Sequence, residues 1–421
     1  MITAITKVTS ALTSLGASVM IPIFIFVICM VFGAKFKKSL MAGLTFGAAY
    51  IGLNLIINLM VSTVSPMVNI MVEEWGLHND VLDVGWAVGS AIAYSTKCGS
   101  VIILVSLGVN VLMLALKLTK TLNVDVWNFW NHAFTASVVY IVSGSFALGL
   151  LAGAIHAAYG LFMADRMAKR VQEFYNLPGV SITHPWVVTS IPIIVAVNWV
   201  LDRIPVVKDI NWDEKHIQEK WGVFGSPLVL GTVLGLVLGA LAGYWKDIPK
   251  LLNAAISIGA VMMIIPKFIA LFMESLSVVS DAAKKFMKKH FGDREFYVGL
   301  DSAILIGHPT TVAAGIILIP ITLVLAVLLP GNRVLPFADL ASLAYFVAMV
   351  PCISKGNLFR SIICGIVIMT IVMYVCTGFG SAMTTMALQA GFTLPKGAVD
   401  ITGLSMGNWL TWILSKIAAI F

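Results

Sequence analysis

The sequence predicts an all-α polytopic membrane protein, on the strength of its composition, its scarcity of charge and its recurring apolar runs. Of the 421 residues, 59% are hydrophobic and 11% are charged, and the mean hydropathy is +0.96. A soluble domain carries about 25% charged residues, because its surface must meet water. Here 20 acidic and 27 basic residues are too few to coat such a surface. The composition therefore excludes a soluble enzyme, a nucleic-acid-binding domain and a disordered chain.

Ten apolar stretches are expected to cross the membrane as helices. A span needs about 20 mostly apolar residues, because unpaired backbone groups are unfavourable in hydrocarbon. The first stretch is long enough to remain as a span and is not read as a removable signal peptide. The expected spans are 17–33, 41–62, 100–118, 133–160, 186–201, 223–245, 251–273, 311–329, 336–352 and 358–380.

Two further apolar runs, 83–97 and 297–310, are too short or too interrupted to cross alone. Each contains glycine, small residues and polar groups, and each ends just before a long apolar stretch. Such a pattern indicates a broken helix or a re-entrant hairpin that lines a cavity.

The two broken runs belong to two halves with the same order of elements. A shift of 214 residues places Thr96 on Thr310 and Asp125 on Asp339. In both halves two long spans are followed by a polar stretch, a broken run, another long span and a helix that begins with Asp. At the start of a helix, a carboxylate is expected to cap free backbone amides. The chain is therefore predicted to contain an internal repeat.

Charge differs between the corresponding loops of the two halves. Lys and Arg favour the cytoplasmic side of a membrane, so opposite charge bias predicts that the halves are inverted. Inverted repeats with paired broken helices indicate a transporter whose site lies near the midplane of the membrane. Before the first broken run lie Glu73, Glu74, Asp80 and Asp83, and before the second lie Lys284, Lys285, Lys288, Lys289 and Arg294.

Four segments follow from this reading. The first repeat is assigned to 1–201, a polar linker to 202–222, the second repeat to 223–380 and a C-terminal tail to 381–421. The linker is interpreted as a solvated interfacial loop with a short helix. The apolar end of the tail fits either an interfacial helix or a partial span.

Ionisable groups inside a membrane are costly, so each is a candidate for function. Asp301 leads, because it follows Gly299 in the second broken run; its carboxylate can accept hydrogen bonds from two hydroxyls of a polyol. The alternative is a helix cap or a local ion pair. His308 lies about two helical turns later and can share a face with Asp301. Its imidazole suits a hydroxyl-rich ligand, or it is a satisfied His at a helix end, next to Thr310, the last candidate of this run.

Three other places supply candidates. His184 precedes Pro185 at an expected helix start, where it is either a substrate-facing group or an interfacial His. Glu274 ends an expected span and lies either at the membrane surface or at the site. The first broken run offers an indole that can stack on a sugar and hydroxyls that can orient it, or else an interfacial belt residue and small packing residues. These residues are Trp86, Ser90, Tyr94, Ser95 and Thr96.

Several signals of chemistry are absent from the sequence. There is no Walker loop for ATP, no cluster with metal-ligand spacing and no hydrolase motif, so no metal or cofactor is expected. The five cysteines lie in or beside apolar stretches and are interpreted as reduced packing residues. Energy for transport must then come from a gradient or from separate proteins.

Seven motifs spread over nearly the whole chain resemble those of a known family. The chain is similar to the membrane-embedded IIC component of the galactitol branch of the bacterial phosphoenolpyruvate-dependent sugar phosphotransferase system, which is related to the ascorbate IIC transporters. The motifs are DVGW (83–86), NVDVWNFW (123–130), HAA (156–158), GVFGSP with the following GTVLGLVLGALAGY (222–244), FYVGLDSAILIGH (296–308), PGNRVLPFADLA (330–341) and KGNLFR (355–360).

The resemblance implies a homodimer in the bacterial inner membrane, with two inverted five-helix repeats per protomer and a core domain that moves like an elevator against a scaffold. It implies that separate cytoplasmic IIA and IIB proteins relay phosphate, so no phosphoryl-transfer residue is expected here. By analogy with the ascorbate relatives, Asp301 and His184 are expected to touch substrate. The chain departs from the galactitol pattern around His184 and at Asn54 and Asn58.

The sequence thus predicts a permease that binds an alditol or monosaccharide, galactitol or a related polyol, and moves it inward for phosphorylation by IIB. Two rival hypotheses stay open. A proton-coupled secondary transporter of a small polar solute would use Asp301 and His308 as titrating groups. A membrane-integral enzyme is the third, although no nucleophile–base pair is visible. Membrane lipid is expected around the protein, and nucleic acid is not.

Overall fold

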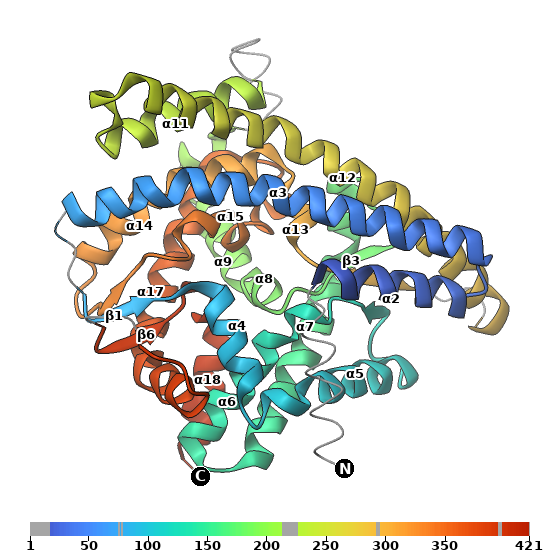
Figure 1. Cartoon of the computed structure of the whole chain (residues 1–421). Helices are drawn as coiled ribbons and strands as arrows, with labels where there is room; N and C mark the ends of the chain where they lie inside the picture. The colour runs from blue at the N-terminus through green and yellow to red at the C-terminus, as the bar shows by residue number, and fades with distance from the viewer. Residues whose placement is uncertain are drawn as a thin grey trace.

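The fold was analysed in a computed structural model that describes residues 17–74, 76, 79–212, 226–291, 295–394 and 398–420. The described chain is mostly helical, and two long helices lie along the top of the molecule above a group of shorter ones (Figure 1). The linker prediction for 213–222 and the basic residue Arg294 fall outside the described residues. The described start of the linker contains one short 3₁₀ turn, Val207–Asp209.

Four helices form one packed unit, with α3 and α12 running in opposite directions. At one end the ring of Phe32, just before α3, lies 5.2 Å from that of Phe286, near the end of α12. At the other end Gly243, just before α12, lies beside the carboxylate of Glu74, which ends α3. The basic clusters around Lys35 and Lys285 therefore lie at the same end of the two long helices. The unit consists of α2 (Ala17–Val31), α3 (Phe36–Glu74), α11 (Pro227–Leu241) and α12 (Ile248–Phe291).

Glycines on α11 let its backbone approach that of α12. A Cβ added at Gly235 would lie 2.7 Å from the Cα of Ala255, and one added at Gly231 would lie 2.9 Å from the Cα of Gly259. Small residues at a helix crossing permit this close packing, which stabilises helix pairs where water is absent.

The remaining helices lie beneath this unit and surround the centre of the molecule (Figure 1). In the first half they are α4 (Gly85–Ser95), α5 (Gly99–Ala115), α6 (Trp130–Ser143), α7 (Phe146–Tyr175), α8 (Pro185–Thr189) and α9 (Ile191–Leu201). In the second half they are α13 (Ala303–Ile306), α14 (Pro309–Leu328), α15 (Leu343–Phe346), α16 (Val350–Ile353), α17 (Leu358–Gln389) and α18 (Trp409–Ala418).

Among the described residues, α3, α7, α14 and α17 are long and apolar enough to cross a membrane. The first broken run is bent as expected, because α4 and α5 meet at 91° and together would make a fifth span. The expected span 133–160 is instead two helices. Gly144 ends α6 with a φ of +68°, and the hydroxyl of Ser145 accepts from the backbone N–H of Leu148 to begin α7. The run 336–352 likewise divides into short turns.

In the described part of the chain, six short strands that the sequence analysis did not predict form two parallel sheets. The orders are β5-β1-β6 and β2-β4-β3, so each sheet takes its central strand from one half of the chain and its outer strands from the other. The strands are β1 (Val81–Asp83), β2 (Thr121–Asn123), β3 (Val180–Ile182), β4 (Tyr297–Leu300), β5 (Val334–Leu335) and β6 (Asp400–Thr402).

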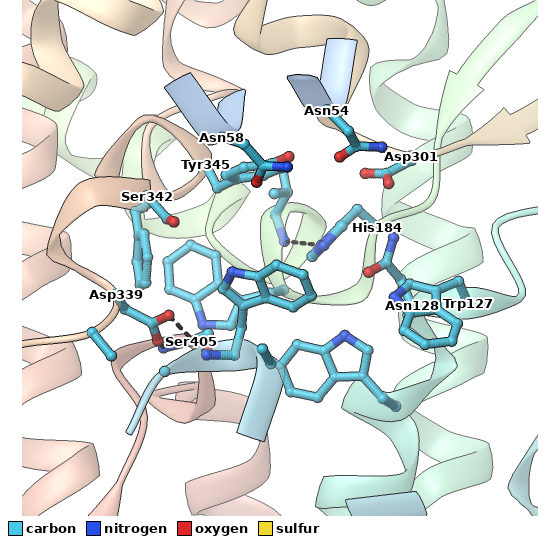
Figure 2. Close-up of a pocket in the computed structure, with 18 of the residues that line it drawn as sticks. Asn54, Asn58, Trp127, Asn128, His184, Asp301, Asp339, Ser342, Tyr345 and Ser405 are labelled. Carbon is cyan, nitrogen blue, oxygen red and sulfur yellow. Dashed lines mark hydrogen bonds between the residues drawn. The ribbon is translucent and has the colours of Figure 1, made fainter. Parts of the chain in front are cut away.

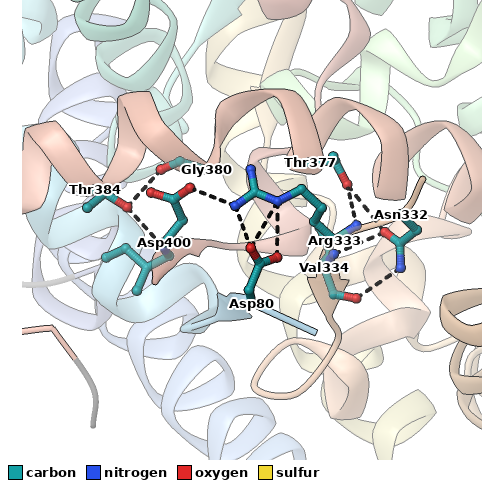
Figure 3. Close-up of polar contacts among 9 residues, drawn as sticks. Asp80, Asn332, Arg333, Val334, Thr377, Gly380, Thr384 and Asp400 are labelled. Atoms are coloured by element: carbon teal, nitrogen blue, oxygen red, sulfur yellow. Dashed lines mark hydrogen bonds and ion pairs between the residues drawn. The ribbon is translucent and has the colours of Figure 1, made fainter. Parts of the chain in front are cut away.

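An ion pair joins the two halves where the strands of each sheet begin. In the first sheet the guanidinium of Arg333, just before β5, donates to both carboxylate oxygens of Asp80, just before β1, and also to Asp400 at the start of β6 (Figure 3). In the second sheet the ammonium of Lys120, just before β2, lies 2.6 Å from the carboxylate of Glu295, ahead of β4. Each sheet therefore has an ion pair between the two halves at the end where its strands begin.

Candidate functional site

A cavity of about 510 Å³ lies at the carboxyl ends of both sheets. Residues that follow each of the six strands line it, together with one face of α3 and part of the segment after β5. Ligands of parallel sheets bind outside the carboxyl ends of the strands, where polar side chains and backbone groups converge. Lining residues after the strands include Trp86, Asn128, His184, Asp301, Asp339 and Ser405, and α3 supplies Tyr50, Asn54 and Asn58.

Asp301 reaches the cavity directly from the end of β4 (Figure 2). Its Oδ1 accepts a hydrogen bond from the backbone N–H of Ala303 at 3.0 Å, which fixes the turn into α13. The expectation that Asp301 and His308 share a helical face was wrong, because the helix between them, α13, spans only Ala303–Ile306 and contains neither residue. The carboxylate is half-buried and retains acceptor capacity toward the cavity.

His184 is held at the start of α8, as its position before proline predicted. Its Nδ1 accepts from the backbone N–H of Val187 at 3.5 Å, and Pro185 occupies the first helical position. A neutral imidazole whose Nδ1 accepts carries its proton on Nε2, so His184 can offer one N–H donor to a ligand. The side chain is 9% exposed and lines the same cavity as Asp301.

Trp86 presents its indole to the cavity from the first turn of α4 and is 44% exposed. Its backbone N–H donates to Oδ1 of Asp339 at 2.8 Å (Figure 2). Asp339 was expected to cap its own helix; it makes no such bond and its other oxygen accepts from the backbone N–H of Ser405. Three more indoles line the cavity, so aromatic faces surround the polar groups. They are Trp127, Trp130 and Trp186.

The hydroxyls predicted from the first broken run do not line the cavity. Ser90 donates to the carbonyl of Ala87, and Tyr94 donates to that of Trp127 at 2.7 Å. Thr96 shares a 2.6 Å hydrogen bond with Ser137. Each of these hydroxyls therefore has a partner within the protein, and Ser90 follows the common pattern in which a helical Ser bonds a carbonyl of the preceding turn.

The remaining predicted residues also lie away from the cavity wall. The Nδ1 of His308 accepts from the backbone N–H of Thr310, and its ring packs 5.0 Å from that of Phe174. The hydroxyl of Thr310 donates to the carbonyl of Gly356 at 3.0 Å. Glu274 does not end a span, because α12 continues to Phe291, and its side chain is exposed on that helix.

Several lining residues were missed by the sequence analysis. Asn128 uses its amide N–H to bond Oδ1 of Asp125 at 2.7 Å, which leaves its carbonyl oxygen as an acceptor. Tyr345, Ser342 and Ser405 reach the cavity from the second half. Of these residues only Asn128 had a recognisable signal in the sequence, namely its position three residues after Asp125. The described residues contain no group of three or more His, Cys, Asp or Glu that could hold a metal ion.

Comparison with known proteins places the chain in a family. A family profile described as "PTS system sugar-specific permease component" matches residues 11–397. A permease IIC component of Escherichia coli (strain K12), named without a substrate, is 40% identical over 97% of this chain and 93% of its own length. The galactitol-specific EIIC component of the PTS in the same strain is 36% identical over 96% of this chain and 89% of its own length. The chain therefore belongs to the family of PTS system sugar-specific permease components, as its seven motifs indicated.

Proposed function

We propose that the chain binds an alditol, galactitol or a related polyol, in the 510 Å³ cavity and carries it inward for phosphorylation by a separate IIB protein. The observation that carries the proposal is the joint presence of the acceptor Asp301, the donor His184 and the indole of Trp86 on one cavity. A hydroxyl both donates and accepts, so this set can bond successive hydroxyls of a polyol while indoles cover its C–H faces. A galactitol-specific relative at 36% identity supports the substrate class.

We also propose that the two halves are inverted repeats, with the α2, α3, α11 and α12 unit as scaffold and the remaining helices as a moving core. The antiparallel course of α3 and α12, the exchange of strands and the similar ion pairs support this. The scaffold contributes Asn54 and Asn58 to the cavity, whereas the core contributes Asp301, His184 and Trp86. An elevator motion of the core would therefore carry those three residues with the substrate.

The order of elements supports a second repeat that extends beyond residue 380. After β3 the chain continues into α8 and α9, and after β6 it continues into a 3₁₀ turn and α18. We propose that 398–420 belongs to the second repeat as the counterpart of 180–201. In the membrane the protein is proposed to form a homodimer, and its location is proposed to be the bacterial inner membrane.

Ligand binding to the purified protein tests the site. We expect calorimetry or a thermal-shift screen to detect galactitol or another alditol, and Asp301→Asn to weaken binding about 10- to 100-fold, since a hydrogen bond to a charged group contributes about 1.5–3 kcal/mol. Asp281→Asn, an exposed carboxylate on α12, is the matched control. Unchanged affinity in Asp301→Asn would remove this carboxylate from the site.

A transport assay distinguishes the proposed phosphotransfer-coupled permease from a proton-coupled transporter. Proteoliposomes that contain only this chain are expected to equilibrate labelled alditol without accumulating it, with or without a pH gradient. Addition of IIA, IIB and phosphoenolpyruvate on the cytoplasmic side should then produce alditol phosphate. Accumulation of unmodified solute driven by a proton gradient, and abolished by a protonophore, would contradict the phosphotransfer coupling.

A further inference from the structure

The single-turn helix α8 begins directly after the cavity residue His184. It is hydrogen-bonded to the start of the C-terminal helix α18. The side-chain amide of Asn408 donates to the hydroxyl of Thr189 at 2.9 Å, and that hydroxyl donates to the carbonyl of Trp186 at 2.6 Å. The indole N–H of Trp409 donates to the carbonyl of Thr189 at 2.6 Å. Asn408 and Thr189 are 4% and 2% exposed, so these bonds lie in the interior.

The two faces of α8 have different partners. His184, Trp186 and Val187 line the cavity, whereas Thr189 at the end of the turn contacts the start of α18. A helix of five residues is too short to hold its own conformation, so its orientation comes from α9, which begins two residues after it ends, and from the elements packed against it. A small cavity of about 10 Å³ lies between these elements and has room for at most one water, so they pack closely.

A second polar chain links α18 to the beginning of α8. The hydroxyl of Thr411 lies 2.7 Å from that of Thr135 on α6, and Thr135 lies 2.7 Å from Nδ1 of His156 on α7. The Nε2 of His156 approaches the carbonyl of Pro185 at 3.5 Å. Both ends of α8 are therefore connected through hydrogen bonds to residues in the first turn of α18.

We propose that Asn408 and Trp409 are positioning residues that set the orientation of His184 in the cavity, so that the C-terminal helix is part of the substrate-binding machinery. The inference rests on the proposed alditol site. Neither residue would touch the ligand from α18 itself; each acts through Thr189 and the turn that ends there. Loss of their donors would let α8 rotate and move the His184 N–H away from the hydroxyl that it bonds.

Three conservative substitutions each remove a hydrogen bond between α8 and α18 while keeping both helices. Asn408→Ser keeps a side-chain oxygen to cap α18, where Asn408 now accepts from the backbone of Leu410, but it is too short to reach Thr189. Trp409→Phe removes the indole N–H and keeps an aromatic ring against Tyr159. Thr189→Val removes the hydroxyl at nearly constant volume. Thr370→Val is the matched control, because that hydroxyl bonds only within α17, to Ile366, among the interactions resolved for it.

We expect Asn408→Ser and Trp409→Phe each to weaken alditol binding 5- to 30-fold, and to raise the KM of phosphorylation in the reconstituted system with little change in kcat. The thermal midpoint should fall as well, because each variant loses a buried hydrogen bond, whereas Thr370→Val should leave alditol affinity unchanged. The double variant with Asn408→Ser and Thr189→Val should bind alditol no more weakly than the single variant of lower affinity. Both substitutions remove the same hydrogen bond between Asn408 and Thr189.

Two outcomes would overturn the inference. Wild-type affinity in both Asn408→Ser and Trp409→Phe would show that α18 does not position the site. A lower thermal midpoint with unchanged affinity would show that these hydrogen bonds only stabilise the fold. Failure of the wild-type protein to bind any alditol would instead contradict the proposed function, and the two failures are thereby distinguished.

Discussion

The backbone N–H of Trp86 donates to the carboxylate of Asp339, 253 positions further along the chain. Asp83, at the end of β1, makes the reciprocal connection: its Oδ2 accepts from the backbone N–H groups of Phe337 and Asp339. Both carboxylates are almost fully buried, at 1% exposure or less. Backbone donors therefore satisfy two buried carboxyl groups and tie the first broken run to the segment after β5.

Replacement of Asp339 by Asn should loosen this connection. One side of the Asn side chain is an N–H₂ group, which would face either the N–H of Trp86 or that of Ser405 and leave it without an acceptor. An unsatisfied buried donor costs about 1–3 kcal/mol, so we expect a lower thermal midpoint in detergent. Alditol affinity should fall as well, because Trp86 loses its anchor. Asp202→Asn, at an exposed carboxylate that pairs with Arg360, is the control, and equal midpoints in the two variants would refute the argument.

Gly85 is predicted to tolerate no side chain. Its φ is +80°, and an added Cβ would lie 2.9 Å from the Cβ of Ala338 and 3.3 Å from Oδ1 of Asp339. A left-handed conformation costs an L-residue about 1–2 kcal/mol, and the contact adds to that cost. Gly85→Ala should therefore lower both the thermal midpoint and alditol affinity. Gly108→Ala on α5, where a Cβ meets open space, should be neutral or slightly stabilising; equal effects of the two would contradict the prediction.

The ion pair between Asp80 and Arg333 should make stability depend on acid pH. The guanidinium of Arg333, hydrogen-bonded to Asp80, holds the pKa of that carboxyl below its usual value. A carboxyl whose pKa is lower in the folded protein stabilises it above the unfolded pKa of about 3.9, and this contribution is lost as pH falls through the folded pKa.

Asp80→Asn should accordingly lower the thermal midpoint slightly at pH 6, since partly exposed ion pairs contribute about 1 kcal/mol or less. Near pH 3 the difference between variant and wild type should shrink. The measurement is a series of melting curves between these pH values, with the exposed Asp209→Asn as reference. A difference that grows toward acid pH would have the wrong sign for this mechanism.

The crossing of α11 and α12 should depend on glycine. In Gly235→Val the new Cβ would press against the backbone of Ala255, so the helices must separate. Overpacking of this kind costs about 1–3 kcal/mol. We expect a lower thermal midpoint with alditol affinity preserved, because neither residue lines the cavity. Val233→Ile, at an exposed position of the same helix, should have little effect, and a normal midpoint for Gly235→Val would exclude tight packing here.

The sequence singled out Asp301, His184 and Trp86, which line the cavity, because polar or aromatic groups beside glycine or proline in short apolar runs are locally conspicuous. It did not separate them from Ser90 and Thr96, which look equally polar in the sequence. Whether a hydroxyl faces a cavity or bonds a carbonyl of its own turn depends on the rotation of the helix, which a broken run leaves undetermined.

The strands could not be detected from the periodicity of hydrophobic residues in the sequence. An alternating pattern needs at least four residues to be visible, and five of the six strands have two or three. β4 has four residues, but all of them are buried and show no alternation. It was therefore absorbed into an expected broken helix, and His308 was placed on the same helical face as Asp301. The division at Gly144 was different, since glycine followed by Ser is a recognisable helix boundary inside a run that hydropathy alone reads as continuous.

The exchange of strands between halves has a bearing on biosynthesis. β2 and β3 never touch each other as neighbours, because β4 lies between them. When the first 201 residues of the nascent chain have been synthesised, β2 and β3 are present without the strand that lies between them. That strand, β4, follows about a hundred residues later. Each half is the template that the other requires, so separately expressed halves should acquire native sheets only when they meet in the same bilayer.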